Sequence, residues 1–340
     1  MTTQDSLTIN LTTVTPIWTG GIEGKADRLH ATGIMGSLRW WYEVLVRGLG
    51  GNACDPSEHT CLYNKDTPPH YDLCDVCRVF GATGWSRRFR LAVTDETQLQ
   101  PVGQWDRRVT ASRSYKDRSG RDRTPTWFFD NPPRAGSANI TITAIDRRFQ
   151  AEIVGGLIQF LADWASIGAR PQMGFGLVRT TTRHDTHYLL TYLQSSITGS
   201  KTYRDLPSLQ NIFFASISED RLPRNETFNL KYDLRRLFAA NADLRHFVMG
   251  TVQREREGAK IMMSRPYNKD STIRVWGWIP DEISKFRTTR EQIIKQIHTH
   301  LKTHYTLNYW REFNSQRDTQ QQYTDPEEFL KSLLEGQHDS

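Results

Sequence analysis

Apolar residues recur at two different spacings along the first half of the chain, and these spacings predict its elements. Residues 7–12 alternate between apolar and polar, which is the pattern of a half-buried strand. Over 33–46 and 152–166 apolar residues recur every three or four positions, which predicts two amphipathic helices. By the same reasoning we expect three more strands, over 87–93, 139–145 and 177–182.

These elements follow the order strand, helix, strand, strand, helix, strand. That order is the split arrangement of ferredoxin-like domains, which RNA-recognition domains share with many unrelated proteins. We therefore predict an α+β fold with a ferredoxin-like (βαββαβ) domain at residues 1–187. The topology alone assigns no function.

A chain of 340 residues is long enough for a second domain, which we place at residues 188–340. Its expected strands cover 209–217, 260–264 and 273–279, and its expected helices cover 230–249, 292–301 and 325–334. No clear final strand follows, and 314–323 has the composition of a solvated connector. A second ferredoxin-like unit, partly helical, would make the two domains a tandem pair.

All four cysteines fall within 24 consecutive residues: Cys54, Cys61, Cys74 and Cys77. Clustered thiolates suit a tetrahedral zinc ion, which binds sulfur at roughly 2.3 Å. His59 or His70 could replace one sulfur, and free structural thiols are the alternative to a metal. We expect residues 52–80 to be a Cys-rich insertion that holds structural zinc, since no ligand position is left open for catalysis.

The net charge of +6 is concentrated in residues 105–123, which alone carry +4. This polar, aperiodic segment predicts a long mobile loop or a hairpin. Guanidinium groups bind phosphate and stack on bases, and nearby aromatic rings offer stacking surfaces, unless they turn inward beneath a solvated loop. The basic residues are Arg107, Arg108, Arg113, Lys116, Arg118, Arg121 and Arg123, and the aromatic ones are Tyr115, Trp127, Phe128 and Phe129.

A glycine-rich loop, GARPQMGFG, follows the second helix at residues 168–176. Gly168 can close the helix, while Gly174 and Gly176 remove side chains that would hold a ligand's backbone away. Arg170 adds a cation, and bare amide groups in such a turn form an anion-binding concavity. A helix cap followed by a β-bulge is the alternative interpretation.

Four stretches together resemble the CRISPR-associated RAMP superfamily, and within it the first-numbered RAMP subunit of the type III-B, or Cmr, effector complex. They are TPIWTGG (15–21), GSLRWWYEVLVRGLGG (36–51), the LC-x-x-CRVFGATGWSRRFRL stretch (73–91) and IGARPQMGFG (167–176). The resemblance covers about the first 180 residues, and the rest of the chain offers no matching motif.

The resemblance implies an RNA-guided antiviral complex in which this subunit contacts guide RNA near its 3′ end and helps engage target RNA. The expected partners are guide (CRISPR) RNA, target single-stranded RNA and other RAMP subunits. Target cleavage belongs to other subunits, so no catalytic residue is expected. The family's RNA contacts carry over to the glycine-rich loop and the tryptophan-rich helix, and nearby cations would hold phosphates: Gly168, Arg170, Gly174, Gly176, Arg39, Trp40, Trp41, Arg87 and Arg88.

Two other functions stay open. Some RAMP proteins cleave RNA with a histidine base, and His30 lies between the first strand and first helix, with Lys25 or Arg28 to stabilise charge on the phosphate. A protein-interaction scaffold without RNA affinity is the other alternative.

The pairs His184 with His187 and His300 with His304 lack a third metal ligand, which favours surface histidines. Without a signal peptide or an apolar run that spans a bilayer, we expect a cytoplasmic protein.

Overall fold

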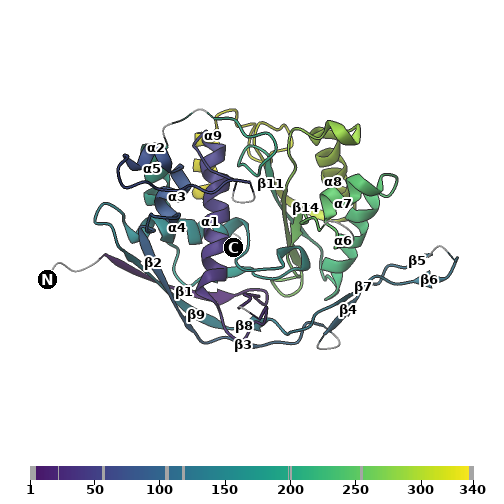
Figure 1. Ribbon diagram of the computed structural model, residues 1–340. Helices are drawn as coiled ribbons and strands as arrows, with labels where there is room; N and C mark the ends of the chain where they lie inside the picture. The colour runs from purple at the N-terminus through teal and green to yellow at the C-terminus, as the bar shows by residue number, and fades with distance from the viewer. Residues whose placement is uncertain are drawn as a thin grey trace.

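A computed structural model describes residues 5–21, 23–55, 58–103, 107–116, 119–197, 199, 201–252 and 256–336. It contains two four-stranded antiparallel sheets with helices packed beside them, as Figure 1 shows. The predicted α+β class is confirmed. In the part of the chain that is described, no helix has both the length and the apolar character that a bilayer crossing requires.

The first sheet has the strand order β10-β1-β9-β2. Its strands are β1 (Ser6–Thr13), β2 (Phe89–Asp95), β9 (Ser137–Ala144) and β10 (Val178–Thr180). The helices beside it are α1 (Ala31–Gly48), α4 (Ala151–Trp164) and α5 (His187–Ser196). Ile9 and Ile140 pair across β1 and β9 and are fully buried with the apolar side of α4. The alternation in β1 therefore has the expected physical cause, because the opposite face carries the exposed Thr8 and Thr141 hydroxyl pair.

The second sheet has the strand order β12-β13-β11-β14. Its strands are β11 (Ile212–Ser218), β12 (Ile261–Met263), β13 (Thr272–Trp278) and β14 (Thr306–Glu312). The later helices are α6 (Glu226–Leu237), α7 (Ala242–Met249), α8 (Arg290–His304) and α9 (Pro326–Leu334), with short 3-10 turns η1 (Pro171–Met173) and η2 (Ser284–Phe286). Both sheets thus place the first and third of their four strands in the centre.

Two sequence predictions for the second half are wrong. The single helix expected over 230–249 is α6 and α7, separated where Asn241 caps α7 by accepting a hydrogen bond from the Leu244 amide at 3.0 Å. The final strand that seemed missing is β14, whose last four residues are buried although two of them are Arg311 and Glu312. Charged residues in a buried strand do not produce the apolar pattern on which the prediction relied.

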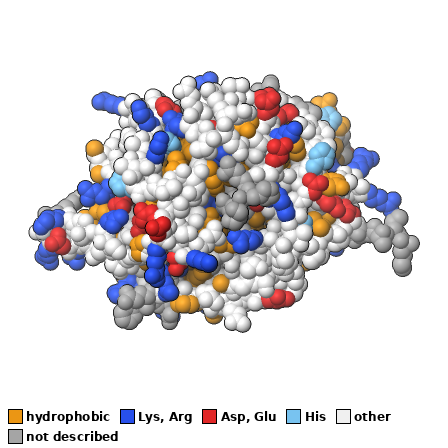
Figure 2. Space-filling view, turned by 180° about the vertical axis from the view of Figure 1, so that it is seen from behind, with side chains coloured by type: hydrophobic (Ala, Val, Ile, Leu, Met, Phe, Trp, Pro, Cys, Tyr) orange, Lys and Arg blue, Asp and Glu red, His pale blue; other side chains and the backbone are white. Residues whose placement is uncertain are grey.

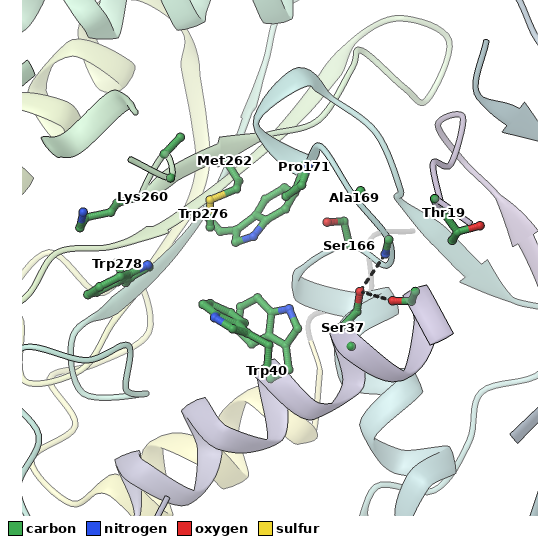
Figure 3. A pocket seen from close by; sticks show the side chains of 17 residues that line it. Thr19, Ser37, Trp40, Ser166, Ala169, Pro171, Lys260, Met262, Trp276 and Trp278 are labelled. Carbon is green, nitrogen blue, oxygen red and sulfur yellow. Dashed lines mark hydrogen bonds between the residues drawn. The ribbon is translucent and has the colours of Figure 1, made fainter. Parts of the chain in front are cut away.

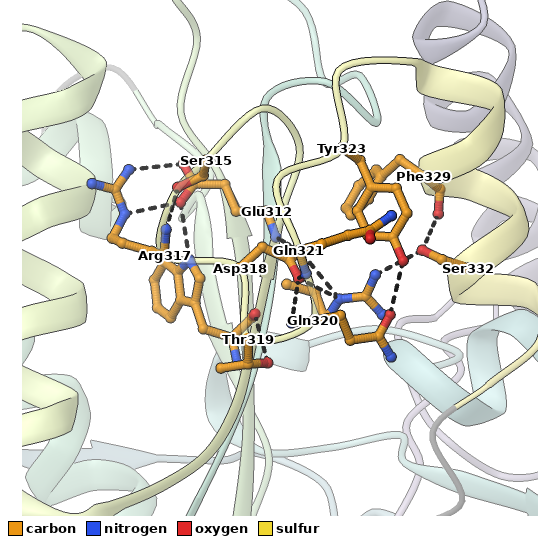
Figure 4. Close-up of polar contacts among 12 residues, drawn as sticks. Glu312, Ser315, Arg317, Asp318, Thr319, Gln320, Gln321, Tyr323, Phe329 and Ser332 are labelled. Atoms are coloured by element: carbon orange, nitrogen blue, oxygen red, sulfur yellow. Dashed lines mark hydrogen bonds and ion pairs between the residues drawn. The ribbon is translucent and has the colours of Figure 1, made fainter.

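Most residues of the connector expected to be solvated, 314–323, are exposed, but the connector also supplies partners for those buried charges (Figure 4). Asp318 accepts from Arg311 Nε at 3.1 Å, and both side chains are fully buried. Glu312 pairs with Arg317 at 3.0 Å and with Arg290 at 3.0 Å. Burial raises the pKa of Glu312, but the two arginines outweigh it and leave that pKa below its ordinary value.

We call the sheet β10-β1-β9-β2 with α1, α4 and α5 the first unit, and the sheet β12-β13-β11-β14 with α6, α7 and α8 the second unit; each has its own buried cluster, and the two units meet through residues of the first cluster. Residues of β11 alternate between them: Phe213 packs with the helices of the second unit, and Phe214 packs against the first. The Phe214 ring stacks on Trp41 of α1 at 5.8 Å between centroids. Helix α9 also packs on the first unit, where the Trp164 indole donates to the Leu333 carbonyl at 2.8 Å. This double burial explains why β11 is a continuous apolar run rather than an alternating one.

Strands β2 and β9 continue as one long hairpin beyond the first sheet (Figure 1). Its further pairs are β3 (Gln98–Leu99) with β8 (Arg134–Ala135), β4 (Arg108–Thr110) with β7 (Thr126–Phe128), and β5 (Tyr115–Lys116) with β6 (Asp122–Arg123). We call residues 107–116 and 119–129 the arm. Of the two forms expected for the basic segment, loop or hairpin, the described part is a hairpin.

Candidate nucleic-acid interface

A pocket of about 580 Å3 lies between the two sheets (Figure 3). Helix α1 forms its floor, the glycine-rich loop and the loop at Thr19 form one side, and β12 and β13 form the other. We call it the inter-sheet pocket. Its lining is mostly glycine and tryptophan, with the indoles of Trp40, Trp41, Trp276 and Trp278.

The tryptophans reach the pocket in two pairs, each with one buried and one half-exposed ring. On α1, Trp41 is buried and Trp40 packs edge-on against it at 4.8 Å between centroids. On β13, Trp276 and Trp278 are two residues apart and so lie on one face of the strand, and Trp276 is the buried one. Half-exposed indoles held by buried neighbours are suited to stacking on flat unpaired bases.

Two polar side chains of the inter-sheet pocket, Ser37 and Lys260, are already engaged in hydrogen bonds. Ser37 Oγ donates to the Gly33 carbonyl at 3.2 Å and accepts from the Gly168 amide at 2.9 Å, which ties the glycine-rich loop to α1. The Lys260 ammonium donates to the Phe247 carbonyl at 3.0 Å and to Glu257 at 3.2 Å. Burial lowers the pKa of Lys260, which makes it a weak anchor for an additional anion.

The glycines of the loop are required by the protein's own chain. A Cβ at Gly168 would lie 2.5 Å from the Trp18 carbonyl oxygen, and one at Gly174 would lie 2.6 Å from Arg265 Cγ. At Gly176 it would lie less than 3.0 Å from the Ile167 carbonyl oxygen, and φ there is +93°. The expectation that Gly174 and Gly176 leave room for a ligand needs correction, because both are buried and the close approach is internal.

Arg170 lies outside the inter-sheet pocket. Its backbone is left-handed, with φ 61° and ψ 38°, and its guanidinium carbon lies 3.9 Å from the centre of the Trp18 ring. Burial lowers the pKa of Arg170, with a smaller opposite effect from Asp130. The loop backbone beside it, at Gly168, Ala169 and Pro171, does line the pocket. The loop thus contributes backbone to one side of the pocket and a stacked cation to another surface.

Two of the other arginines expected to contact RNA, Arg39 and Arg88, instead bond to groups of the protein itself. Arg39 donates to Glu43 at 3.1 Å, to the Gly81 carbonyl at 3.2 Å and to Cys77 Sγ at 3.2 Å. Arg88 pairs with Asp146 at 2.7 Å. Arg87 is exposed. Among these three, only Arg87 therefore presents an exposed guanidinium to a ligand in solution.

The arm carries cations along an exposed hairpin. Figure 2 shows Lys and Arg side chains gathered at the end of the molecule where the arm projects. Arg113 pairs with Asp233 of α6 at 3.1 Å, and Lys116 lies 3.9 Å from Asp122. Arg107, Arg108, Arg121 and Arg123 are exposed, whereas Arg118 falls outside the described residues. The arm therefore presents a cationic surface that is anchored to the second unit.

Some aromatic residues of the arm turn inward and others offer exposed rings for stacking, so each of the two alternatives from the sequence applies to part of the set. Phe129 is buried in a cluster with Trp18 and Phe228, so it packs inward at the root of the arm. Phe128 is 72% exposed and Tyr115 is 40% exposed, which leaves their rings available for stacking. Trp127 is half-buried, 4.9 Å from the Phe228 ring.

The four cysteines converge on one point. The sulfurs of Cys54, Cys61, Cys74 and Cys77 all lie within 4.8 Å of one another. Cys54 and Cys77 are 3.7 Å apart, close to the edge of roughly 3.8 Å that a tetrahedron with 2.3 Å metal–sulfur bonds would have. Two short helices, α2 (Pro69–Asp72) and α3 (Asp75–Phe80), carry this part of the chain, and Cys74 caps α3. Hydrogen bonds from the sulfurs of Cys54 and Cys77 lower the pKa of Cys74. The donor set fits a metal ion; neither His59 nor His70 belongs to it.

His30 lies beside a carboxylate, whereas the sequence suggested Lys25 or Arg28 as a cation that would stabilise charge on a bound phosphate. Its ring nitrogen lies 2.7 Å from Asp27, its side chain is 14% exposed, and Lys25 pairs with Glu23 instead. His187 lies 3.2 Å from the Thr191 hydroxyl, and His304 stacks on His300. Within the described ranges the cysteine cluster is the one group of three or more metal-ligating side chains that the structure brings together.

The second unit contributes two tryptophans to the pocket that the sequence pattern alone did not identify as site residues. Trp276 and Trp278 come from the strand predicted over 273–279, and their two-residue spacing placed them on one face. What this face meets is decided by packing against α1, which no local pattern indicates.

One protein family matches half of the chain. The sequence profile of the RAMP superfamily matches residues 10–179. Among solved structures, Cmr1 from Pyrococcus furiosus (apo form) is 13% identical and covers 89% of this chain and 98% of its own, with a TM-score of 0.47. A chain of the type III-B Cmr-beta complex bound to cognate target RNA is 11% identical, covering 88% of this chain and 99% of its own, with a TM-score of 0.48. No curated protein sequence matches the chain.

Proposed function

The chain belongs to the RAMP superfamily, and from this premise we propose that it is a non-catalytic RNA-binding subunit of a type III-B CRISPR effector complex. It contacts guide RNA near its 3′ end and helps to engage target single-stranded RNA beside other RAMP subunits. The work of such a subunit is to hold an RNA strand, and the location that we propose for it is the cytoplasm.

The inter-sheet pocket is the observation that carries this proposal. It combines two half-exposed indoles, Trp40 and Trp278, with the backbone of the glycine-rich loop. Unpaired bases stack on such rings without regard to sequence, which suits a subunit that must accept any guide. The exposed arginines of the arm supply the phosphate-binding surface that the pocket itself lacks. We interpret the two sheets, with their common strand order, as tandem ferredoxin-like units.

A structural zinc ion at the cysteine cluster completes the proposal. Four thiolates from the Cys-rich segment between α1 and β2 would close its coordination shell, so the ion would supply folding energy and no open position for catalysis. Arg39 connects this cluster to α1, because its guanidinium bonds both Cys77 and Glu43. The metal would thereby help to orient the helix that carries Trp40.

A histidine-dependent ribonuclease has less support. The partner of His30 is the carboxylate of Asp27, whereas cleavage of a phosphodiester also needs a cation to stabilise the charge that develops on the phosphate. Lys25, one candidate for that cation, is paired with Glu23 at 2.7 Å.

The test measures retention and length of a labelled single-stranded RNA with the purified full chain. Replacing Trp40 and Trp278 together by alanine should weaken retention by about tenfold or more, since stacking on one aromatic ring contributes roughly 1–3 kcal/mol per base. Tyr71→Ala removes a ring that is 75% exposed outside the pocket and serves as the matched control. Equal retention of RNA by the double variant and the control variant would contradict the proposal. If the wild type shortens the RNA and His30→Ala leaves it at full length, the protein is a nuclease instead.

A further inference from the structure

A second pocket, of about 780 Å3, lies between the arm and helices α6 and α7. We call it the arm pocket. Tyr115 and Trp127 line it from the arm, and α6 and α7 contribute cations to the opposite wall. Its lining contains four basic side chains and no acidic one: Lys231, Arg235, Arg236 and Arg245.

Lys231 is the most unusual of these residues. The residue is only 6% exposed, yet no carboxylate pairs with its ammonium group anywhere in the described part of the chain. Burial, and next the like charge of Arg235, lower the pKa of Lys231 to about 8. A buried amine without a counter-ion is costly, and proteins normally pair such a group or neutralise it.

The neighbouring arginines repeat the same arrangement. Burial and the charge of Arg245 lower the pKa of Arg235, whose guanidinium donates to the Gly250 carbonyl at 3.1 Å. Arg245 Nε is buried and has no hydrogen-bond partner among the described residues. Like charges gathered around an open volume, with an unfilled donor, are stabilised when an anion enters.

The aromatic groups of the arm pocket restrict the kind of anion. The Tyr115 and Tyr232 rings are 6.2 Å apart, and the Arg236 guanidinium lies 6.0 Å from the centre of the Tyr232 ring. Aromatic faces beside cations accommodate a base next to a phosphate. A free inorganic anion would use only the cationic wall.

The arm is held against α6 independently of any ligand. The Ser112 amide donates to Asn229 at 2.7 Å, and Arg113 pairs with Asp233. The two walls of the arm pocket are therefore positioned in advance, which lowers the entropic cost of binding.

We propose that the arm pocket is a second RNA-binding site, in which Lys231 and Arg245 hold a backbone phosphate and the tyrosine pair contacts the adjacent unpaired base. The inference rests on the proposed function for the identity of its ligand, an RNA strand. It extends that function to a surface on the second unit, so that one strand is held at two separate places.

The experiment titrates the full chain into a fluorescein-labelled single-stranded decauridylate and follows anisotropy across a salt series. Lys231→Met and Arg245→Gln should each raise Kd about tenfold, the loss expected for one buried charge-assisted hydrogen bond. Each should also reduce the slope of log Kd against log salt by about one. Lys331→Met removes the same charge from an exposed lysine of α9 and should change Kd by less than about twofold.

The outcomes separate this inference from the proposed function. Wild-type affinity in both arm-pocket variants, combined with lost affinity in the Trp40 and Trp278 double variant, overturns the arm pocket alone. If the wild-type protein binds no RNA, both the proposed function and the proposal that an RNA strand occupies the arm pocket are overturned. A third outcome is that uridine monophosphate binds the wild type but not Lys231→Met, while the two proteins bind RNA equally well. This result would assign the arm pocket to a free nucleotide and would overturn the proposal that it binds an RNA strand.

Discussion

Replacing Lys231 with methionine is expected to stabilise the protein at neutral pH. Methionine keeps the length of the side chain and removes the ammonium group, which is buried without a carboxylate partner in the described part of the chain. The pKa of Lys231 falls from 10.5 to about 8, first because of burial and second because of Arg235. Since one pKa unit corresponds to about 1.4 kcal/mol, keeping this amine charged in the folded state costs about 3 kcal/mol.

The pH dependence of this gain has a definite sign. The folded-state pKa lies below the unfolded-state value, so proton binding favours the unfolded chain and the full cost is present below about pH 8. Between about 8 and 10.5 the cost disappears, because lysine in the unfolded chain then loses its proton as well. The advantage of Lys231→Met should therefore shrink as pH rises through this range.

Urea denaturation at pH 7 and at several higher values measures the free energy of unfolding directly. Lys331→Met is the control, because it removes an exposed lysine whose side chain is 64% accessible and should change stability by less than about 0.5 kcal/mol. A Lys231→Met protein that is less stable than the wild type at pH 7 would refute the reasoning. So would a difference between the two proteins that does not change with pH.

Three further predictions concern the fold and the metal. Glu312→Gln should lower the free energy of unfolding by about 3 kcal/mol, because it leaves Arg290 and Arg317 without their buried anion. Since the Glu312 pKa is lowered in the fold, this loss should be present above about pH 4.5 and vanish in acid, as denaturation at several pH values would reveal. Gly176→Ala should lower the free energy of unfolding by about 3 kcal/mol in the same assay, since φ is +93° and the Ile167 carbonyl leaves no space for a methyl group. As the control, Gly36→Ala has nothing within 4 Å of the added methyl group and should leave that free energy unchanged or raise it by up to about 1 kcal/mol. Elemental analysis should find one zinc ion per chain, and Cys74→Ser should lower that content and the melting temperature together; a metal-free wild-type protein would contradict this prediction.

Local patterns predicted the elements of the first unit closely. The alternation over 7–12 appears in β1, because one face of that strand is buried and the other carries the exposed Thr8. The helical spacing over 33–46 appears in α1, although the second half of that helix, from Trp41 to Gly48, is buried on all sides. In the second unit the same rules missed β14, where Arg311 and Glu312 are buried among partners from 314–323. A pattern based on apolarity does not indicate a strand whose burial depends on ion pairs.

The candidate site was predictable in its residue types more than in its geometry. The tryptophan-rich helix and the glycine-rich loop were recognised, and both line the inter-sheet pocket. Their partners on β12 and β13 were not recognised, and Arg170 lies outside the pocket although the loop that carries it lines one side. Lys231 and Arg245 gave no signal, because a lysine or arginine in an amphipathic helix normally indicates a solvated face.

The sequence by itself determined the α+β class, the family resemblance and the clustering of four cysteines, because each depends on residues that are close in the chain or on a local period. The tertiary structure decided which cations are free and which are paired, since Arg39, Arg88 and Arg113 find partners through the fold. It also decided where the pockets lie. Both are formed between segments distant in sequence, α1 with β13 in one case and the arm with α6 in the other, and only long-range packing brings such surfaces together.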